Sequence, residues 1–255
     1  MGSFGGHAVP GSFFIVFGIW WTIQMIRRYF NCQNDKTEYI STATFKIKRF
    51  PIEPAFKLFF VTVGLVIEVG ISGNMQHSTM YFFYGLTGIV DLMVFFNFNL
   101  PKDLDYVAMC IAIGTEAVLF NFHFVEGEML VMVVHKLLLY VLIVTFFVII
   151  AEMRFKNSIL VSLLRPFFVT LQGTWFLQIG FILYSPVGDP WDMTSHRSIM
   201  NAALVFTWHC GAIFLVMLFT FTVFSRIYRR KDPKNTCNYK PLETEKEPLI
   251  SDSEL

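Results

Sequence analysis

The chain has 255 residues, of which 55% are hydrophobic and 15% are charged, and its formal net charge is +1. Soluble globular domains carry about 25% charged residues, and a soluble core of this length cannot bury so much apolar surface. The composition therefore excludes an ordinary soluble protein, and we expect a membrane protein with the lipid bilayer as its main partner and no nucleic-acid partner.

Seven segments are long and apolar enough to cross the hydrocarbon core as helices, which takes roughly 20 residues each. The first is not preceded by a basic region and is followed by Arg27 and Arg28, which predicts an uncleaved helix rather than a signal peptide. The expected fold is an all-α membrane protein, a seven-transmembrane-helix bundle over residues 1–225. Its predicted helices are 11–30, 55–72, 78–98, 104–124, 129–151, 158–184 and 199–225.

The distribution of basic residues predicts how the bundle is oriented. Of the 20 Lys and Arg residues, all except Lys136 and Arg197 lie on one side. That side comprises the loops after the first, third and fifth segments, the adjoining helix ends and the C-terminal tail. Basic residues accumulate on the cytosolic side of membrane proteins. We therefore expect an outside or luminal N-terminus and a cytosolic C-terminus.

Residues 226–255 are polar and charged, and we expect a disordered cytosolic tail. Two strings in it resemble sorting signals that clathrin adaptors bind as extended peptides. "YKPL" has the Tyr-x-x-apolar form, with Tyr239 and Leu242, and "EKEPLI" has the acidic dileucine form, with Glu245, Leu249 and Ile250. They predict clathrin adaptor complexes as partners and traffic among the Golgi, endosomes, lysosomes and plasma membrane.

Ionisable side chains inside the predicted helices are costly in lipid and therefore mark candidate functional positions. They gather in the outer half of the predicted bundle. Histidine and carboxylate side chains from several helices at similar depth suit a zinc ion, which takes about four such ligands. The candidate metal ligands are His77, Glu116, His123, His135 and His209.

A second interpretation needs no metal and makes these groups a polar network between helices, or a pH-sensitive one. Its further members are His7, Glu68, Gln172 and Gln178. If the protein were an enzyme, Glu116 or Glu68 would be the candidate catalytic base. Asp91 lies fourteen residues after His77 on the same helix face, and we expect it to pair with a polar group nearer the cytosol.

Five strings resemble the transmembrane protein 45 family: "GHAVPGSFF" from Gly6, "FGIWW" from Phe17, "QHSTMYFFYG" from Gln76, "QGTWFLQIGFILYSP" from Gln172 and "TWH" from Thr207. They run from the first predicted helix to the seventh. The resemblance implies a multi-pass protein of Golgi and endolysosomal membranes with no assigned biochemical activity. It also implies shared positions at His7, His77, Glu116, His123, His135 and His209.

The first hypothesis for function is therefore a non-enzymatic endomembrane protein whose polar cluster binds a metal or senses pH. The alternative is an intramembrane zinc-dependent lipid hydrolase, in which zinc activates a water. The alkaline ceramidase and adiponectin-receptor group is of this kind, but its paired histidines in the last helix are absent because His209 stands alone. A seven-helix receptor or a transporter is a further alternative.

Overall fold

A computed structural model describes residues 3–45, 50–72, 75–123 and 128–231. Over these residues the chain forms seven α-helices and one π-helix, η1 (Glu68–Ser72), which continues directly from the second α-helix. The α-helices are α1 (Phe4–Asn34), α2 (Ile52–Ile67), α3 (Met75–Phe95), α4 (Leu104–His123), α5 (Met129–Arg154), α6 (Ile159–Tyr184) and α7 (His196–Lys231). Each overlaps one predicted segment, and the expectation of an all-α protein of the membrane class is confirmed.

Six of these helices are long and apolar enough to cross a membrane, and α2 is the exception. With 16 residues, α2 is about 24 Å long, which is shorter than the hydrocarbon core of about 30 Å. The five residues of η1 extend α2. The first of them is Glu68, so an ionisable side chain lies at the junction of the two helices.

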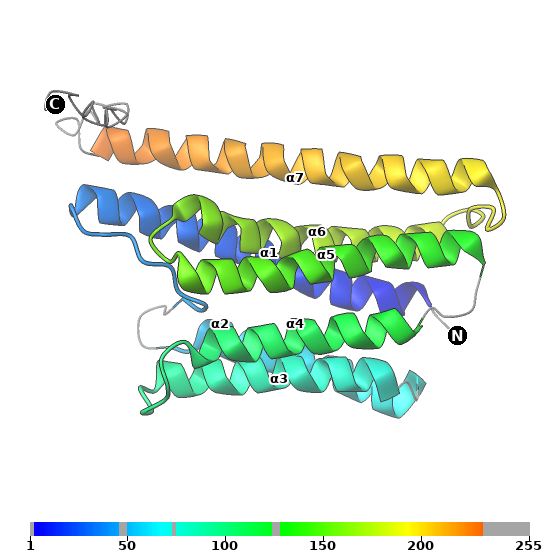
Figure 1. The fold of residues 1–255 in the computed structure, drawn as a ribbon, viewed down its shortest axis with the longest axis horizontal. Helices are drawn as coiled ribbons and strands as arrows, with labels where there is room; N and C mark the ends of the chain where they lie inside the picture. Colours follow the sequence, from blue (N-terminus) through cyan, green and yellow to red (C-terminus); the bar gives the residue numbers. More distant parts are fainter. Residues whose placement is uncertain (1–2, 46–49, 73–74, 124–127, 232–255) are drawn as a thin grey trace, which may run out of the picture.

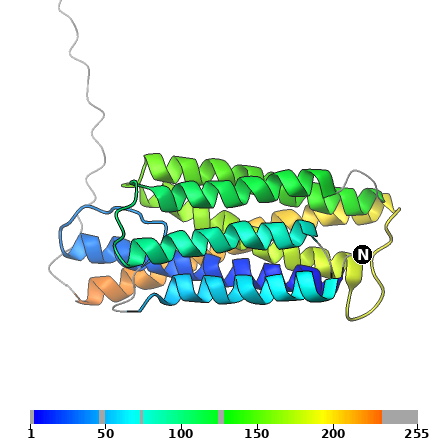
Figure 2. The same cartoon turned by 90° about the horizontal axis from the view of Figure 1, so that it is seen from below.

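Successive helices run in opposite directions along one long axis, as two views at right angles show (Figures 1 and 2). We call the end that holds Phe4, Ser72 and Met129 the N-terminal end, and the end that holds Asn34, Phe95 and Arg154 the C-terminal end. In Figure 1, α1, α5 and α6 lie between α7 on one side and the group of α2, α3 and α4 on the other.

The contact between α1 and α6 is the most extensive in the bundle, and glycines allow their backbones to meet. A Cβ on Gly173 would lie 2.6 Å from the Ile15 backbone nitrogen, and one on Gly18 would lie 2.1 Å from Thr170 Oγ1. Small residues at a crossing allow the backbones of membrane helices to approach closely. This close packing stabilises their association, because in lipid no hydrophobic effect drives the helices together.

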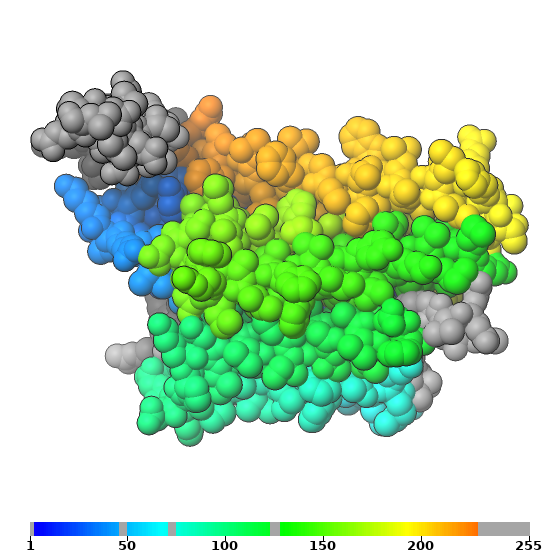
Figure 3. All heavy atoms as spheres, viewed as in Figure 1, coloured from blue at the N-terminus to red at the C-terminus, as the bar shows by residue number. Residues whose placement is uncertain are grey.

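The last helix, α7, lies along one edge of the molecule (Figure 3) and is the least buried of the six candidate spans. Its exposed apolar residues include Leu204, Trp208, Phe214 and Phe219. A helix that is apolar where no protein covers it is suited to contact with lipid tails.

Most helix ends differ from the predicted bounds by a few residues, and the largest difference is in α1, which begins at Phe4 rather than at residue 11. The third helix ends at Phe95 rather than 98, because Asn97 adopts a positive φ of 56°, and the N–H groups of Asn97 and Phe98 donate back to the carbonyls of Val94 and Met93. The seventh continues to Lys231, so residues 226–231 are helical and not part of a disordered tail. Residues 232–255, with the predicted sorting residues Tyr239, Leu242, Glu245, Leu249 and Ile250, lie outside the described residues.

Candidate functional site

Glu116 lies at the centre of the polar residues near the N-terminal end. Its side chain is fully buried, accepts a hydrogen bond of 2.5 Å from the Tyr84 hydroxyl, and accepts two more of 3.0 and 3.1 Å from Gln172 Nε2. We call these three residues the Glu116 site. The predicted network thus joins Glu116 to Gln172, and the structure adds Tyr84, which the sequence reasoning missed.

A cavity of about 40 Å³ borders the Glu116 site and is lined by side chains of α1, α2, η1, α3, α4 and α6. Its polar lining consists of Glu68, His77, Tyr81, Tyr84 and Glu116, and aromatic rings such as Phe13 and Phe176 form half of the rest. We call it the carboxylate cavity. Because a buried site needs only about 10–15 Å³ and polar partners to hold a water, this cavity can hold water beside Glu116.

Glu68 and His77 form a pair at the same cavity, with His77 Nδ1 3.3 Å from Glu68 Oε1. Glu68 is the first residue of the π-helix, a rare form that is frequent at functional sites. Gly64, one turn earlier, allows the Tyr81 ring to cross α2, since a Cβ there would lie 2.3 Å from that ring. The local geometry of α2 and η1 therefore serves to bring carboxylate, imidazole and phenol together.

His7 and His135 form a separate group closer to the N-terminal end. Their ring centroids are 5.8 Å apart, and each Nδ1 bonds to a carbonyl one turn back in its own helix, Ser3 or Val131. Because a carbonyl can only accept, both Nδ1 atoms carry a proton. The Tyr184 ring completes the group at 5.4 Å from His7. His7 also contacts the Phe176 ring and His135 the Phe120 ring, and both phenylalanines line the carboxylate cavity.

The remaining predicted residues lie apart. His209 packs edge-on against Trp175, with centroids 5.8 Å apart, and Gln178 is half-buried on α6. His123 ends α4, and its side chain lies outside the described residues. Among the side chains that the structure describes, no three His, Cys, Asp or Glu residues are arranged to hold a metal ion.

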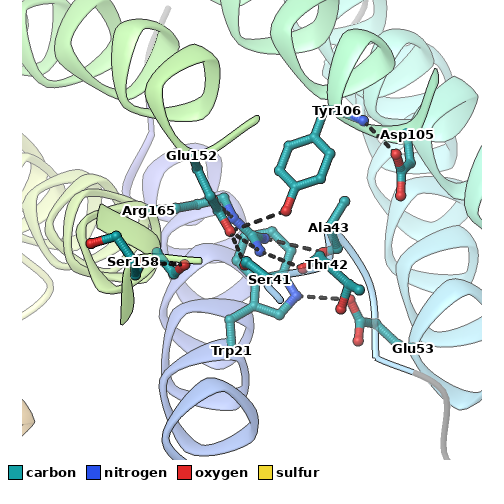
Figure 4. Close-up of polar contacts among 11 residues, drawn as sticks. Trp21, Ser41, Thr42, Ala43, Glu53, Asp105, Tyr106, Glu152, Ser158 and Arg165 are labelled. Atoms are coloured by element: carbon teal, nitrogen blue, oxygen red, sulfur yellow. Dashed lines mark hydrogen bonds and ion pairs between the residues drawn. The ribbon is translucent and has the colours of Figure 1, made fainter. Parts of the chain in front are cut away.

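A larger group of buried charges lies at the C-terminal end (Figure 4). Arg165 of α6 donates to both carboxylate oxygens of Glu152 of α5, at 2.6 and 3.2 Å. Its other N–H groups donate to the backbone oxygens of Thr42 and Ala43 in the loop after α1, and its guanidinium lies 4.4 Å from the centre of the Trp21 ring. Ser41 and Tyr106 also donate to Glu152. We call Trp21, Ser41, Tyr106, Glu152 and Arg165 the ionic cluster.

Two more buried acidic groups lie beside the ionic cluster. Glu53 accepts hydrogen bonds from the Trp20 and Trp21 indoles, at 2.9 and 2.7 Å, and from the Phe45 amide at 3.0 Å. Asp91 pairs with Lys57 at 2.5 Å, and both are almost completely buried. Asp91 thus has the polar partner that its position predicted.

Sequence reasoning missed Lys57, Glu152 and Arg165 because it treated charges near helix ends as cytosolic edge residues. The structure buries all three. One signal was present in the sequence: Arg165 lies seven residues, or two helical turns, inside the predicted sixth segment, where a charge needs a partner.

Two groups in the loops have shifted pKa values. Burial raises the pKa of the Tyr39 phenol, in the loop after α1, above its ordinary value. In the loop before α7, hydrogen bonds from the Thr194 backbone and hydroxyl lower the pKa of Asp192. Asp192 therefore stays negatively charged at the surface of the N-terminal end.

The chain is similar to proteins known by sequence. A family model described as a family of unknown function (DUF716) matches residues 102–222, which cover α4 to most of α7. Transmembrane epididymal protein 1A of Mus musculus is 27% identical over 260 residues, covering 91% of this chain and 84% of that protein. The human transmembrane epididymal protein 1 is 32% identical over 155 residues, covering 58% of this chain and 56% of that protein.

The match to the transmembrane epididymal protein 1 of Rattus norvegicus is about as long as the mouse match. It has 24% identity over 261 residues and covers 90% of this chain and 84% of that protein. Full-length similarity to proteins named as transmembrane agrees with the six long apolar helices. The chain is therefore an integral multi-pass membrane protein, similar to transmembrane epididymal protein 1 and to a family whose function is unknown.

Proposed function

We propose that this protein is a seven-span member of the transmembrane protein 45 family in endomembranes, and that it senses luminal pH through Glu116. Seven spans are supported by the position of η1, which extends α2 toward the length of a span. An outside N-terminus is supported by the basic residues at the C-terminal end. The N-terminal end, with the carboxylate cavity, then faces the lumen or the outside.

The observation that carries the proposal is a buried carboxylate with no cation beside it. Among the described residues, Asp91 has Lys57 and Glu152 has Arg165, whereas no ion pair involves Glu116. An isolated buried charge is costly in a low-dielectric interior. A proton taken up from the luminal side removes that cost, and its loss restores the charge.

The titratable groups that face Glu116 are Tyr81, Tyr84 and His77 from α3 and Glu68 from η1. Gln172 faces it from α6, and its buried Oε1 accepts no hydrogen bond from the described residues. A protonated Glu116 would donate to this oxygen once the amide turned over. The site therefore has two hydrogen-bond arrangements, one for each charge of Glu116.

Infrared difference spectroscopy of the purified protein in lipid nanodiscs tests this proposal. On lowering the pH from neutral to endosomal values, we expect the carbonyl stretch of a protonated, buried carboxylic acid to grow in, and Glu116→Gln to remove it. Asp192→Asn, the corresponding acid-to-amide change at an exposed loop position, should keep the band. A band that survives Glu116→Gln, or no band at all, would rule out Glu116 as the sensor.

Bound zinc and the hydrolase activity that needs it stay predictions. Metal analysis of the purified protein against His135→Ala and His209→Ala tests both, because each requires about one metal per chain that these changes remove. If metal is bound, lipid turnover by wild type and Glu116→Gln distinguishes an enzyme from a structural site.

The proposed traffic rests on the tail sequence. Changing Leu249 and Ile250 to Ala should shift the protein toward the cell surface, because the dileucine signal that adaptors bind would be lost. The same change combined with Tyr239→Ala tests both signals together. A distribution that neither variant alters would refute adaptor-dependent sorting.

A further inference from the structure

We propose that this protein conducts protons across the membrane, along a row of buried titratable side chains that links the carboxylate cavity to the C-terminal end. The proposal rests on the proposed proton site at Glu116 and adds a path from it to the opposite side. Intramembrane rows of acids and their partners are the usual form of proton relays.

The row follows one face of α3. His77, Tyr84 and Asp91 are seven residues apart, so each step is nearly two helical turns, or about 10 Å, on the same face. Each of the three contacts an ionisable group of a neighbouring element. His77 contacts Glu68 of η1, Tyr84 contacts Glu116 of α4, and Asp91 contacts Lys57 of α2.

Two cavities occupy the interior along this row. The carboxylate cavity lies between the Glu68–His77 pair and Glu116. A second cavity of about 20 Å³ shares Phe13, Phe14 and Tyr84 with the first and is also lined by Lys57. At this volume it can hold one water, given polar partners such as the Tyr84 hydroxyl. The second cavity therefore lies between Tyr84 of the Glu116 site and Lys57 of the Lys57–Asp91 pair.

The buried Lys57–Asp91 pair is the next charged group along the row. The groups that face Asp91 are Lys57 and Glu53 from α2 and Asp105 from α4. Asp105 also lines an open cleft of about 500 Å³ at the C-terminal end, together with Asn97, Lys102 and Tyr106. Beyond Asp91, the next acidic group therefore borders bulk water on the side that we propose is cytosolic.

Each transfer moves one proton and needs no other reactant. A proton from luminal water binds at the Glu68–His77 pair and passes through the carboxylate cavity to Glu116. The Tyr84 hydroxyl gives up its proton to water in the second cavity as it receives one from Glu116, and this water passes a proton on to Asp91. Asp91 becomes neutral and separates from Lys57, which keeps its charge. Release to Asp105 and the cleft restores the ion pair, and one positive charge has crossed.

Flux into lipid vesicles tests the proposal. The full chain is reconstituted in phosphatidylcholine vesicles that contain a pH-sensitive dye, and a potassium gradient with valinomycin sets the membrane potential. We expect acidification faster than in protein-free vesicles, in the direction of the potential, because the transfer carries net charge. Tyr84→Phe, which keeps the ring and removes the hydroxyl, should reduce the flux to that of protein-free vesicles.

Asp91→Asn leaves Lys57 buried without its partner, so the double variant Lys57→Met/Asp91→Asn is measured beside it and checked for folding by circular dichroism and size-exclusion chromatography. Loss of flux in the folded double variant, with flux retained in the exposed-loop control Asp192→Asn, supports the path. Wild-type flux in the double variant, or no flux in the wild type, overturns it. An infrared band lost with Glu116→Gln but no flux would leave the proton site standing and refute the path alone.

Discussion

Removing the buried charge of Arg165 should strongly destabilise the protein. Arg165→Met keeps the stem of the side chain but leaves the fully buried Glu152 without its cation. It also removes the donors to Thr42 and Ala43 and the contact with the Trp21 ring. Breaking a buried ion pair from one side costs about 3–5 kcal/mol.

Thermal unfolding in detergent can be followed with a thiol-reactive dye, because Cys32, Cys110 and Cys210 are half-buried thiols in three different helices. Cys237 is changed to Ser so that only these three report. At roughly 2–4 °C per kcal/mol for a chain of this size, the Tm of Arg165→Met should fall by about 10 °C. Arg226→Met, the same change at an exposed position of α7, is the matched control.

A second variant separates the charge from the packing. Arg165→Met/Glu152→Met removes both charges, and apolar replacement of a whole buried pair is often close to neutral. The double variant should therefore melt above Arg165→Met, although it still loses the bonds from Ser41 and Tyr106. The reasoning is refuted if Arg165→Met melts like Arg226→Met, or if the double variant melts below the single one.

Two smaller changes test packing and hydrogen bonding. Gly173→Ala should cost about 1–3 kcal/mol, since its Cβ would lie 2.6 and 2.7 Å from backbone atoms of Ile15 and Gly11. Gly211→Ala is the control, because a Cβ there would have no atom within 4 Å, and it should leave the melting temperature unchanged. Equal effects of the two changes would contradict the close packing of α1 on α6. Tyr39→Phe should raise the melting temperature, because the buried hydroxyl has no hydrogen-bond partner among the described residues and such a group costs about 1–3 kcal/mol. A lower melting temperature would reveal a bond made by that hydroxyl.

The helices could be predicted from the sequence because apolar runs of membrane-spanning length are a local property. The partners of the polar residues could not. Glu116 and Gln172 were both singled out, yet they are 56 residues apart and only the packing of α4 near α6 brings them together. Depth along a helix is readable from the sequence, but the direction in which a side chain faces its neighbours is not. His209 has the predicted depth but faces Trp175 instead of the other histidines.

The charges at the C-terminal end illustrate a second limit. Lys57 and Arg165 support the predicted orientation by their position, and the same position led to their being counted only as basic residues of the cytosolic side. Charge counts record which side of the membrane a residue is nearer, and they carry no information on burial. A Lys or Arg more than one turn inside an apolar segment is the exception, since lipid offers it no solvation and it must find an acid.

The two ends of the bundle are stabilised differently, and this difference bears on where the protein can move. At the C-terminal end, the ionic cluster ties α1, α4, α5, α6 and the loop after α1 through a fully buried ion pair and its hydrogen bonds. At the N-terminal end, the polar groups border cavities, and the junction of α2 and η1 departs from regular α-helix. Opening the C-terminal end would expose buried charges to lipid, whereas the N-terminal end can rearrange around Glu116 by exchanging hydrogen bonds.

We therefore expect a change in the charge of Glu116 to move α2, η1 and α3 against a fixed C-terminal end. Hydrogen exchange at two pH values should then differ over residues 61–72 and 75–88 and remain constant over residues 149–169. Equal changes at both ends would show that the bundle responds as one rigid unit.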